Sequence, residues 1–269
     1  MPPAMEQPRP KTTRLDVVVA ERSGVTRSHA RSLIMAGRVR VDGRTLTKPG
    51  IAIAPDSTLE IERPRPFVSR GGEKLEAALD AFALDVRDLH VLDVGASTGG
   101  FTDCLLRRGA ASVVAVDVGY GQLAWPLRED PRVTVVERTN FRALPDDAFQ
   151  NGFDLIVADV SFISLRTILR RAVGYLRESG TIVALVKPQF EAGRRRVGSG
   201  GVVRDPETHR AVLRELRAAT GELGLGIVAA MLSPLRGPAG NAEFFIELRR
   251  CAHEISEDDL NRLVDEAHG

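Results

Sequence analysis

The spacing of apolar residues divides the chain into two parts that meet near residue 68. In the second part, short apolar runs rich in β-branched residues alternate with segments whose apolar residues recur every three or four positions. This alternation is typical of a mostly parallel sheet covered by helices. The predicted strands are 89–94, 112–118, 133–137, 153–159, 181–186, 227–232 and 243–248, and the predicted helices lie near 101–108, 120–128, 164–177 and 206–223.

The last two predicted strands are joined by residues 233–240 alone, a segment too short for a crossover helix. Strands joined in this way must run antiparallel if they are neighbours. A mostly parallel sheet with an antiparallel end is typical of S-adenosylmethionine (SAM)-dependent methyltransferases and usually absent from dinucleotide-binding Rossmann domains. We therefore predict an α/β domain with the seven-stranded, Rossmann-like fold of these methyltransferases.

The first part of the chain follows another pattern. Apolar residues from Leu15 share one helical face, and Thr26 can cap a second short helix. After Gly37 the pattern changes to a period of two in residues 39–41, followed by the turn pair Asp42-Gly43 and further extended pieces. These features predict a small α+β module in which two helices precede several strands.

A proline-rich segment separates the two patterns. In Arg63-Pro64-Arg65-Pro66, the prolines fix φ and remove hydrogen-bond donors, which favours a stiff linker. A chain of 269 residues is long enough for one full domain and a small one. We predict a disordered tail at 1–13, the α+β module at 14–62, the linker at 63–68 and the α/β domain at 69–269.

Charge is concentrated in the small module. Residues 11–50 hold nine Lys or Arg against three acids, a local charge of +6 in a chain whose formal net charge is +1. A compact basic module indicates a polyanionic partner, most simply nucleic acid, although a solvated basic face is the alternative.

Composition excludes several other classes. Hydrophobic residues make up 43% and charged residues 27% of the chain, as in ordinary soluble proteins. Cys104 and Cys251 are the only cysteines and lie far apart, so we expect neither a disulfide framework nor a metal site. No apolar stretch approaches a membrane span and no signal peptide is evident, so we expect a cytoplasmic protein without a membrane partner.

A glycine-rich stretch, Asp93 to Phe101, follows the first strand of the α/β domain and opens a helix. Its glycines allow a tight turn and close approach to a ligand, and the helix start offers free N–H groups. Ser97 stands where the dinucleotide fingerprint has its second glycine, so an adenosine-bearing ligand without phosphates fits better than a pyrophosphate. The predicted cofactor contacts of this stretch are Asp93, Gly95, Ala96, Ser97, Thr98, Gly99, Gly100 and Phe101.

Further cofactor contacts are expected at the ends of neighbouring strands. Asp117 ends the second strand, where an acid can accept hydrogen bonds from ribose hydroxyls, although a turn or capping aspartate is the alternative. Val118 follows it, and Asp159 ends the fourth predicted strand. Phe162 is a candidate for packing against the adenine or methionine part of the ligand, with a plain core position as the alternative.

Residues 26–43 resemble the S4 RNA-binding domain, in which basic residues borne by helices grip the RNA backbone. The resemblance covers about 14–62. Arginine suits this task because it can bond a phosphate with two N–H groups. A glycine-rich basic loop at 191–201 is well placed for the same partner, although it could be a mobile loop. The predicted RNA contacts are Arg14, Arg22, Arg27, Arg31, Arg38, Arg40, Arg194, Arg195 and Arg196, any one of which could instead be a solubilising surface residue.

Six blocks in order along the chain resemble the TlyA family, historically called haemolysins: 69–75, 95–101, 117–123, 158–165, 186–191 and 240–245. Members of that family are ribosomal RNA cytidine-2'-O-methyltransferases with an S4 domain and an FtsJ-like catalytic domain. The resemblance implies SAM as cofactor, ribosomal RNA as partner, and a catalytic tetrad at Lys74, Asp159, Lys187 and Glu243. The N-terminal extension and the predicted C-terminal helix at 258–267 resemble the longer form, which modifies both 16S and 23S RNA.

The predicted topology independently allows these four residues to meet. Asp159 and Lys187 end parallel strands, and Glu243 opens an antiparallel strand at the same edge. Lys74 lies near the start of a further helix, which is predicted to follow Gly72. Attack by a ribose 2'-hydroxyl on a sulfonium methyl needs a base, for which Lys187 is the candidate. Burial and Lys74 would favour its neutral form, whereas Asp159 and Glu243 would oppose it.

Three other functions remain open at this point. A membrane-active haemolysin would fit the older family name, but the chain lacks a membrane span and a strongly amphipathic, lysine-rich helix. A non-catalytic ribosome-binding factor would not need the intact tetrad. A small-molecule methyltransferase would leave the basic module without a purpose.

Overall fold

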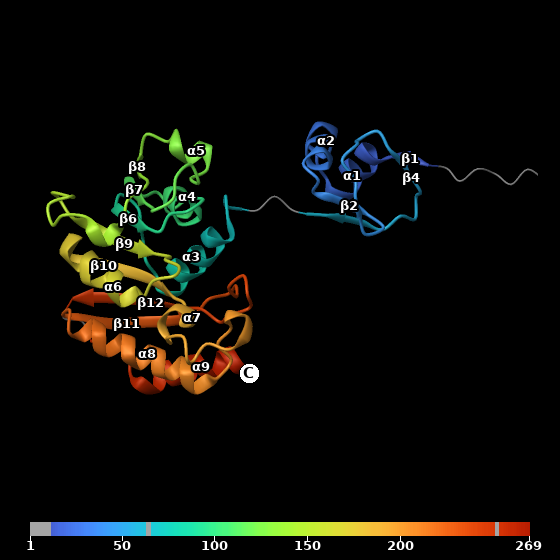
Figure 1. Cartoon of the computed structure of the whole chain (residues 1–269). Helices are drawn as coiled ribbons and strands as arrows, with labels where there is room; N and C mark the ends of the chain where they lie inside the picture. Colours follow the sequence, from blue (N-terminus) through green and yellow to red (C-terminus); the bar gives the residue numbers. More distant parts are fainter. Residues whose placement is uncertain (1–11, 63–65, 251–252) are drawn as a thin grey trace, which may run out of the picture. The chain divides into compact units, whose positions relative to one another are not determined.

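The computed structural model describes residues 12–62, 66–250 and 253–269, which form two compact units on either side of residues 63–65 (Figure 1). The first eleven residues of the predicted tail, the first half of the predicted linker and Cys251 lie outside the described residues. Each unit is described by itself below.

The small unit is the predicted helix-then-strand module. Thr26 caps the second helix, since its Oγ1 accepts a hydrogen bond from the amide of His29 at 3.3 Å. Asp42 and Gly43 both have positive φ, 49° and 76°, as a type I′ hairpin turn requires. The elements are β1 (Thr13–Arg14), α1 (Leu15–Ser23), α2 (Arg27–Met35), β2 (Val39–Val41), β3 (Arg44–Thr45), β4 (Ala52–Ile53) and β5 (Leu59–Ile61).

Two small antiparallel sheets complete this unit, one in the order β3-β2-β5 and one formed by β1 and β4. Thr13, the last residue of the predicted tail, pairs with Ile53. The apolar faces of α1 and α2 and the inward residues of β2 form the core, which contains Leu15, Val19, Leu33, Ile34 and Val39.

The large unit is built on one seven-stranded sheet in the order β11-β12-β10-β9-β6-β7-β8. β12 runs antiparallel to both of its neighbours, and the other adjacent pairs are parallel, which confirms the predicted fold class. The strands are β6 (His90–Val94), β7 (Ser112–Val116), β8 (Val133–Val136), β9 (Phe153–Ala158), β10 (Leu176–Val186), β11 (Leu225–Leu232) and β12 (Phe244–Arg250).

Helices cover both faces of this sheet because its strands are apolar on both sides. Leu92 and Ile156 face the layer that holds α6, α8 and α9, whereas Val91 and Leu155 face α3, α4 and α5. The helices are α3 (Arg70–Ala81), α4 (Gly100–Arg107), α5 (Trp125–Arg128), α6 (Leu165–Ala172), α7 (Pro188–Glu191), α8 (Pro206–Gly221) and α9 (Glu257–His268), with short 3₁₀ turns η1 (Phe141–Ala143), η2 (Val173–Tyr175) and η3 (Ser199–Gly201).

Two predicted helices are shorter than expected. The helix predicted at 120–128 is confined to α5, because Gly121 has φ 68° and its amide donates to Glu137 Oε1 at 3.0 Å, which holds the preceding residues as a loop. The helix predicted at 164–177 ends at Ala172, and β10 begins at Leu176, five residues before the predicted strand.

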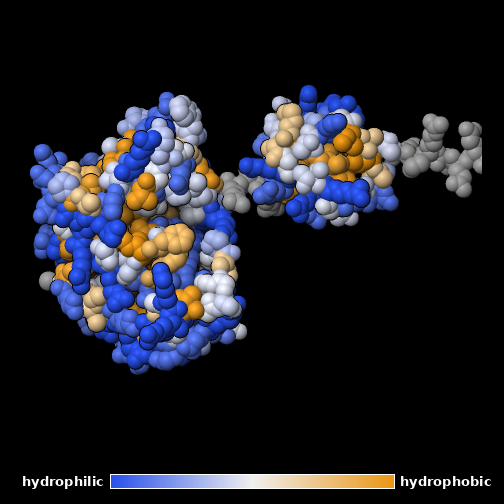
Figure 2. Space-filling model, in the orientation of Figure 1, coloured by the Kyte–Doolittle hydropathy of each residue, from blue (hydrophilic) through white to orange (hydrophobic). Residues whose placement is uncertain are grey.

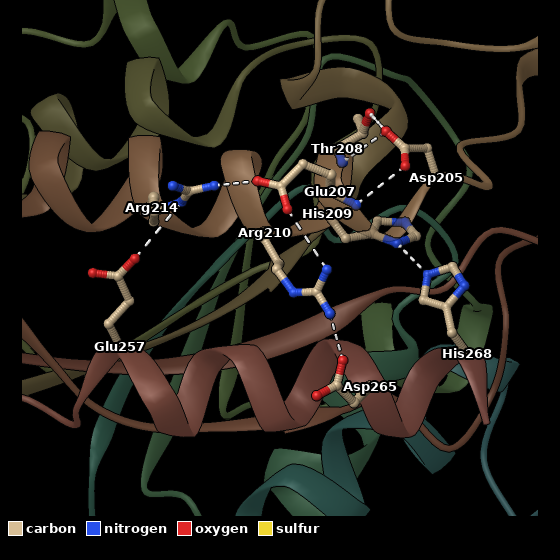
Figure 3. Close-up of polar contacts among 9 residues, drawn as sticks. All are labelled: Asp205, Glu207, Thr208, His209, Arg210, Arg214, Glu257, Asp265 and His268. Atoms are coloured by element: carbon tan, nitrogen blue, oxygen red, sulfur yellow. Dashed lines mark hydrogen bonds and ion pairs between the residues drawn. The ribbon is translucent and has the colours of Figure 1, made fainter.

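Polar contacts join α8 to the C-terminal helix α9 (Figure 3). His209 Nδ1 lies 2.8 Å from His268 Nε2, and Arg210 Nη2 lies 2.5 Å from Asp265 Oδ1. His209 is 1% exposed and packs edge-on against Phe244, the first residue of β12, with ring centroids 5.6 Å apart. The two helices therefore form one layer behind the start of that strand.

Apolar residues are distributed unevenly over the helices and the surface. Within the described ranges, no helix is both long and apolar enough to span a bilayer. On the large unit, apolar residues gather in the middle of the visible face, bordered by hydrophilic ones (Figure 2).

Candidate active site

The candidate site lies where β6, β9 and β10 end and β12 begins. The amide of Asp159 donates to the carbonyl of Val94 at 3.1 Å, which joins the ends of β9 and β6. Val186 pairs with Phe244, and an antiparallel register extended by one residue places Lys187 opposite Glu243. Strand pairing therefore brings three of the four predicted catalytic residues to one edge of the sheet.

Two pairs of opposite charge form at this edge. Lys187 Nζ lies 2.5 Å from Asp159 Oδ1 and donates a hydrogen bond to Ser161 Oγ at 2.9 Å. Lys74 Nζ donates to Glu243 Oε2 at 2.5 Å. Lys74 reaches this position from α3, whose N-terminus is capped by Ser69 Oγ.

Two cavities open beside the first pair. The larger, of about 450 Å³, is lined by both apolar and polar groups, and the smaller, of about 170 Å³, is lined mainly by glycine backbone and hydroxyl groups. Gly95, Ser97, Asp159 and Ser161 line both cavities, and Lys187 lines the smaller one. The two cavities therefore lie next to each other and share one wall.

The predicted cofactor residues are distributed over these walls. Ala96, Thr98, Gly100 and Phe101 line the smaller cavity, and Asp117, Val118 and Phe162 line the larger one. Asp93 and Gly99 belong to neither lining among the described residues.

The glycines of this loop serve packing more than the sequence suggested. A Cβ on Gly100 would come within 2.2 Å of Ser69 Oγ, and one on Gly99 within 2.3 Å of Leu127 Cδ1. These two glycines let α4 pack closely against its protein neighbours. Gly95, with φ 85°, provides the sharp turn after β6, where a Cβ would meet the carbonyl oxygen of Asp159 at 2.7 Å.

Ser97 adopts φ 49°, a conformation that favours glycine. Its amide donates to Asp117 Oδ2 at 2.8 Å, while Asp117 Oδ1 accepts from the amide of Gly119 at 2.6 Å. Asp117 thus holds the loop in place and also lines the cavity. The turn and ligand-contact interpretations of this aspartate are compatible, because each carboxylate oxygen has further acceptor capacity.

Asp93 is fully buried beneath the loop. Its Oδ2 accepts from Thr102 Oγ1 at 2.7 Å, and its Oδ1 has no hydrogen-bond partner within the described residues. Burial raises the pKa of Asp93 to about 7, with a smaller contribution from the charge of Asp159. Asp93 therefore supports the loop from below, through its bond to Thr102 of α4, and does not line either cavity.

Sequence reasoning missed one wall of the larger cavity, residues 139–142. This segment follows β8, and the side chain of Asn140 accepts from the amide of Arg142 at 3.2 Å. The signal available in the sequence was its position directly after the third parallel strand, at the same edge as the glycine-rich loop.

Phe162 is not a core residue, because it is 91% exposed and has φ 65°. Its ring lies 5.0 Å from that of Phe190, centroid to centroid. An exposed aromatic residue in a strained backbone conformation at a cavity wall favours a role in ligand contact over a packing role.

Some of the arginines predicted to contact RNA bond other groups of the protein, and others form no ion pair among the described residues. Arg14 and Arg27 form ion pairs with the buried Asp16, and Arg22 donates to the carbonyls of Pro55 and Ser57. Within the described part of the chain, no ion pair involves the side chains of Arg31, Arg38, Arg40, Arg194 or Arg195.

Arg196 is engaged as well. Its Nη1 lies 2.9 Å from Glu215 Oε1 on α8, and its Nε donates to the carbonyl of Ala192 at 2.7 Å. This arginine holds the basic loop against the large unit, so three consecutive arginines do not make three equivalent RNA contacts.

Comparison with known proteins identifies the family of this chain. The chain matches the FtsJ-like methyltransferase family over residues 67–250 and the S4 domain family over 13–58. It is 52% identical over 266 residues to the 16S/23S rRNA (cytidine-2'-O)-methyltransferase TlyA of Mycobacterium tuberculosis, covering 95% of this chain and 98% of that protein. The chain belongs to the TlyA family of FtsJ-like methyltransferases.

Other members of this family show the same extent of similarity. The putative rRNA methyltransferase YqxC of Bacillus subtilis is 46% identical over 266 residues, covering 96% of this chain and 95% of that one. The structure of a putative hemolysin from Streptococcus thermophilus, 40% identical, superposes with a TM-score of 0.75 and covers 96% of both chains.

Proposed function

We propose that this protein is a SAM-dependent 2'-O-methyltransferase that acts on cytidine in ribosomal RNA, with Lys187 as the general base. The observation that carries the proposal is the Lys187–Asp159 pair, in which Asp159 lines both adjacent cavities and Lys187 lines the smaller one. The names of the TlyA-family relatives support the reaction, and the S4 domain supports an RNA substrate.

The cavities fit SAM in the chemistry of their linings. The larger one offers apolar walls together with Asp117 and Asn140, which suits a nucleoside. The smaller one offers Ser69, Thr98 and backbone groups, which suits the amino-acid part. The carboxylate of Asp159, shared by both, suits the positive charge between them. SAM, when bound, supplies an electrophilic methyl group on a sulfonium.

Residues of this chain then accept the proton and orient the reacting groups. As general base, Lys187 would accept the 2'-hydroxyl proton on Nζ while the ribose oxygen takes the methyl group that SAM would supply, with the thioether as the leaving group. Ser161 and Asp159 orient the amine. The Lys74–Glu243 pair is buried beneath the site and holds the start of β12 beside Lys187.

We propose the two domains that the sequence predicts, with the small unit as the RNA-binding module and Thr13 as part of it. Arg31, Arg38 and Arg40 carry no ion pair among the described residues, and they are the arginines of that unit that we expect to meet RNA phosphates. We further propose that both 16S and 23S RNA are substrates.

The test is methylation of purified 30S and 50S subunits with labelled SAM, followed by mapping of the modified nucleotide. We expect label at a cytidine 2'-oxygen in each subunit. Binding of SAM without transfer to either subunit would contradict an rRNA methyltransferase function, and label on one subunit alone would contradict the dual specificity. Heat-treated enzyme and ribosomes already methylated by the enzyme are the controls.

A further inference from the structure

We propose that Glu191 is a positioning residue for the candidate base: from α7 it caps α6, and so fixes the loop that holds Asp159 and Ser161 against Lys187. This inference rests on the proposed function. Glu191 belongs to none of the predicted catalytic or cofactor positions.

The loop between β9 and α6 has little internal support. Among the described residues, no main-chain amide of 160–163 donates a hydrogen bond to another backbone group. Within it, Phe162 adopts the strained φ of 65° and is almost fully exposed. A segment with strain and few contacts keeps its shape only if its two ends are held.

One end of the loop is held by strand pairing. The amide of Asp159 donates to the carbonyl of Val94 at 3.1 Å. At the other end, Ser164 is the N-cap residue of α6 but makes no capping hydrogen bond with its own side chain. The second anchor must therefore come from elsewhere in the chain.

Glu191 provides it. Its Oε1 accepts from the amide of Leu165 at 2.6 Å, and its Oε2 accepts from Ser164 Oγ at 2.7 Å. Glu191 is 7% exposed, and Arg166 Nε lies 3.7 Å from Oε2. A carboxylate at the first turn of a helix is favoured by both its free N–H groups and its dipole.

The connection from Glu191 back to Lys187 is short and stiff. Pro188 begins α7, the amide of Phe190 donates to the carbonyl of Lys187 at 2.9 Å, and the amide of Ala192 donates to that of Pro188 at 2.9 Å. One carboxylate therefore links the segment that carries Lys187 to the segment that carries its two partners. Without it, Ser161 would be free to move relative to the Lys187 amine, and Asp159 would be held by its bond to Val94 alone.

The first experiment measures the environment of Lys187 directly, by competitive acylation with acetic anhydride followed by mass spectrometry. In Glu191→Ala, we expect Lys187 to be labelled several-fold faster than in the unaltered protein, because its partners no longer hold it. Glu191→Gln keeps an acceptor for the Leu165 amide and should restore most of the protection. Labelling of Lys187 at the unaltered rate in Glu191→Ala would overturn the proposal.

Glu215→Ala is the matched control, because Glu215 also contacts Arg166, at 3.7 Å, but does not cap α6. We expect it to leave Lys187 labelling unchanged, and an equal increase in both variants would overturn the proposal. If Glu191→Ala fails to fold, Glu191→Asp carries the test. Its shorter side chain keeps the charge but cannot reach both donors, so faster Lys187 labelling is expected.

The second experiment measures single-turnover methyl transfer to ribosomal subunits. We expect Glu191→Ala to slow transfer roughly 10- to 100-fold, in line with a displaced catalytic group, and Glu191→Gln to stay within about threefold. Transfer at the unaltered rate would overturn the proposal. If the unaltered protein methylates neither subunit, the proposed function fails, and the labelling experiment still decides whether Glu191 positions Lys187.

Discussion

The two lysine–carboxylate pairs of the site have the same chemistry in different surroundings. The side chains of Lys74 and Glu243 are 8% and 1% exposed, and neither lines the two cavities. Those of Lys187 and Asp159 are 12% and 26% exposed and line the cavity wall. The Lys74–Glu243 pair is shielded from water, so each charge is compensated by its partner. The Lys187–Asp159 pair remains accessible to a ligand.

This difference separates a structural role from a reactive one. Two buried charges compensate each other, and removing one leaves the other without water or partner. A pair at a cavity wall loses less on separation, because water or a ligand can replace the missing partner. We therefore expect changes in the Lys187–Asp159 pair to act mainly on rate and changes in the Lys74–Glu243 pair to act first on stability.

The largest effect should come from Lys187→Ala. Loss of a general base should slow methyl transfer roughly 1,000-fold while SAM binding, measured by calorimetry, changes little. Single-turnover transfer to ribosomal subunits measures the rate. Unchanged turnover would show that Lys187 is not the base, and weakened SAM binding of the same size would assign it to the cofactor instead.

The next effect tests the buried pair. Glu243→Ala leaves Lys74 uncompensated and should lower the free energy of unfolding by about 3–5 kcal/mol, measured by urea denaturation. Asp159→Ala, the matched change in the cavity-wall pair, should lower it by less than about 1 kcal/mol. Equal losses in the two variants would contradict the distinction between the pairs.

A third experiment tests the buried His209, which packs against the start of β12. Burial lowers the pKa of His209 to about 4, with the neighbouring charges of His268 and Arg236 acting in the same direction and Asp205 opposing them. The folded protein disfavours the proton on His209, whereas the unfolded chain binds it below a pKa of about 6.5. The free energy of unfolding is therefore highest above that pKa and decreases as the pH falls towards 4.

The expected loss over that window is on the order of 2 kcal/mol, measured by urea denaturation at pH 7 and pH 4.5. The variant His209→Asn should lose less stability between these two pH values. If it loses as much as the unaltered protein, His209 is not the group responsible. Any loss of methyl transfer at low pH can then be compared with the loss of stability that His209 causes.

The smallest effect concerns RNA binding, which should not depend on either pair. Arg31→Ala should weaken binding to ribosomal RNA by a few-fold and reduce the salt slope by about one, with the transfer rate at saturation unchanged. Arg27→Ala is the control, because its Nε already bonds Asp16 Oδ2 at 3.1 Å and it should lose less affinity. Fluorescence anisotropy at several salt concentrations would measure both. An equal loss in the two variants would contradict the division of the arginines.

Asp16 explains why charge counting alone overstates the RNA-binding face. It is fully buried, and the Arg14 and Arg27 guanidinium groups hold the pKa of its carboxyl well below its ordinary value. Two of the nine basic residues counted at 11–50 therefore stabilise a buried carboxylate. Sequence composition records how many charges a segment has but not which charges neutralise one another in space.

The sequence by itself determined the sheet, because strand and helix periods and the short 233–240 connection are local properties of the chain. It predicted β6, β7, β8, β9, β11 and β12 to within two residues at each end. It was wrong for 120–128, where the conformation of Gly121 and a bond to Glu137 override a helical pattern. Local patterns cannot include such contacts, which join residues far apart in the sequence.

Only the tertiary structure decided how the candidate site is divided. The sequence could name Lys74, Asp159, Lys187 and Glu243 but not which lysine contacts which carboxylate, or which pair is buried. It could not find Glu191, because a residue that caps a helix 26 positions away leaves no local pattern. Burial and pairing are properties of the packed chain, and they determine what each charge can do.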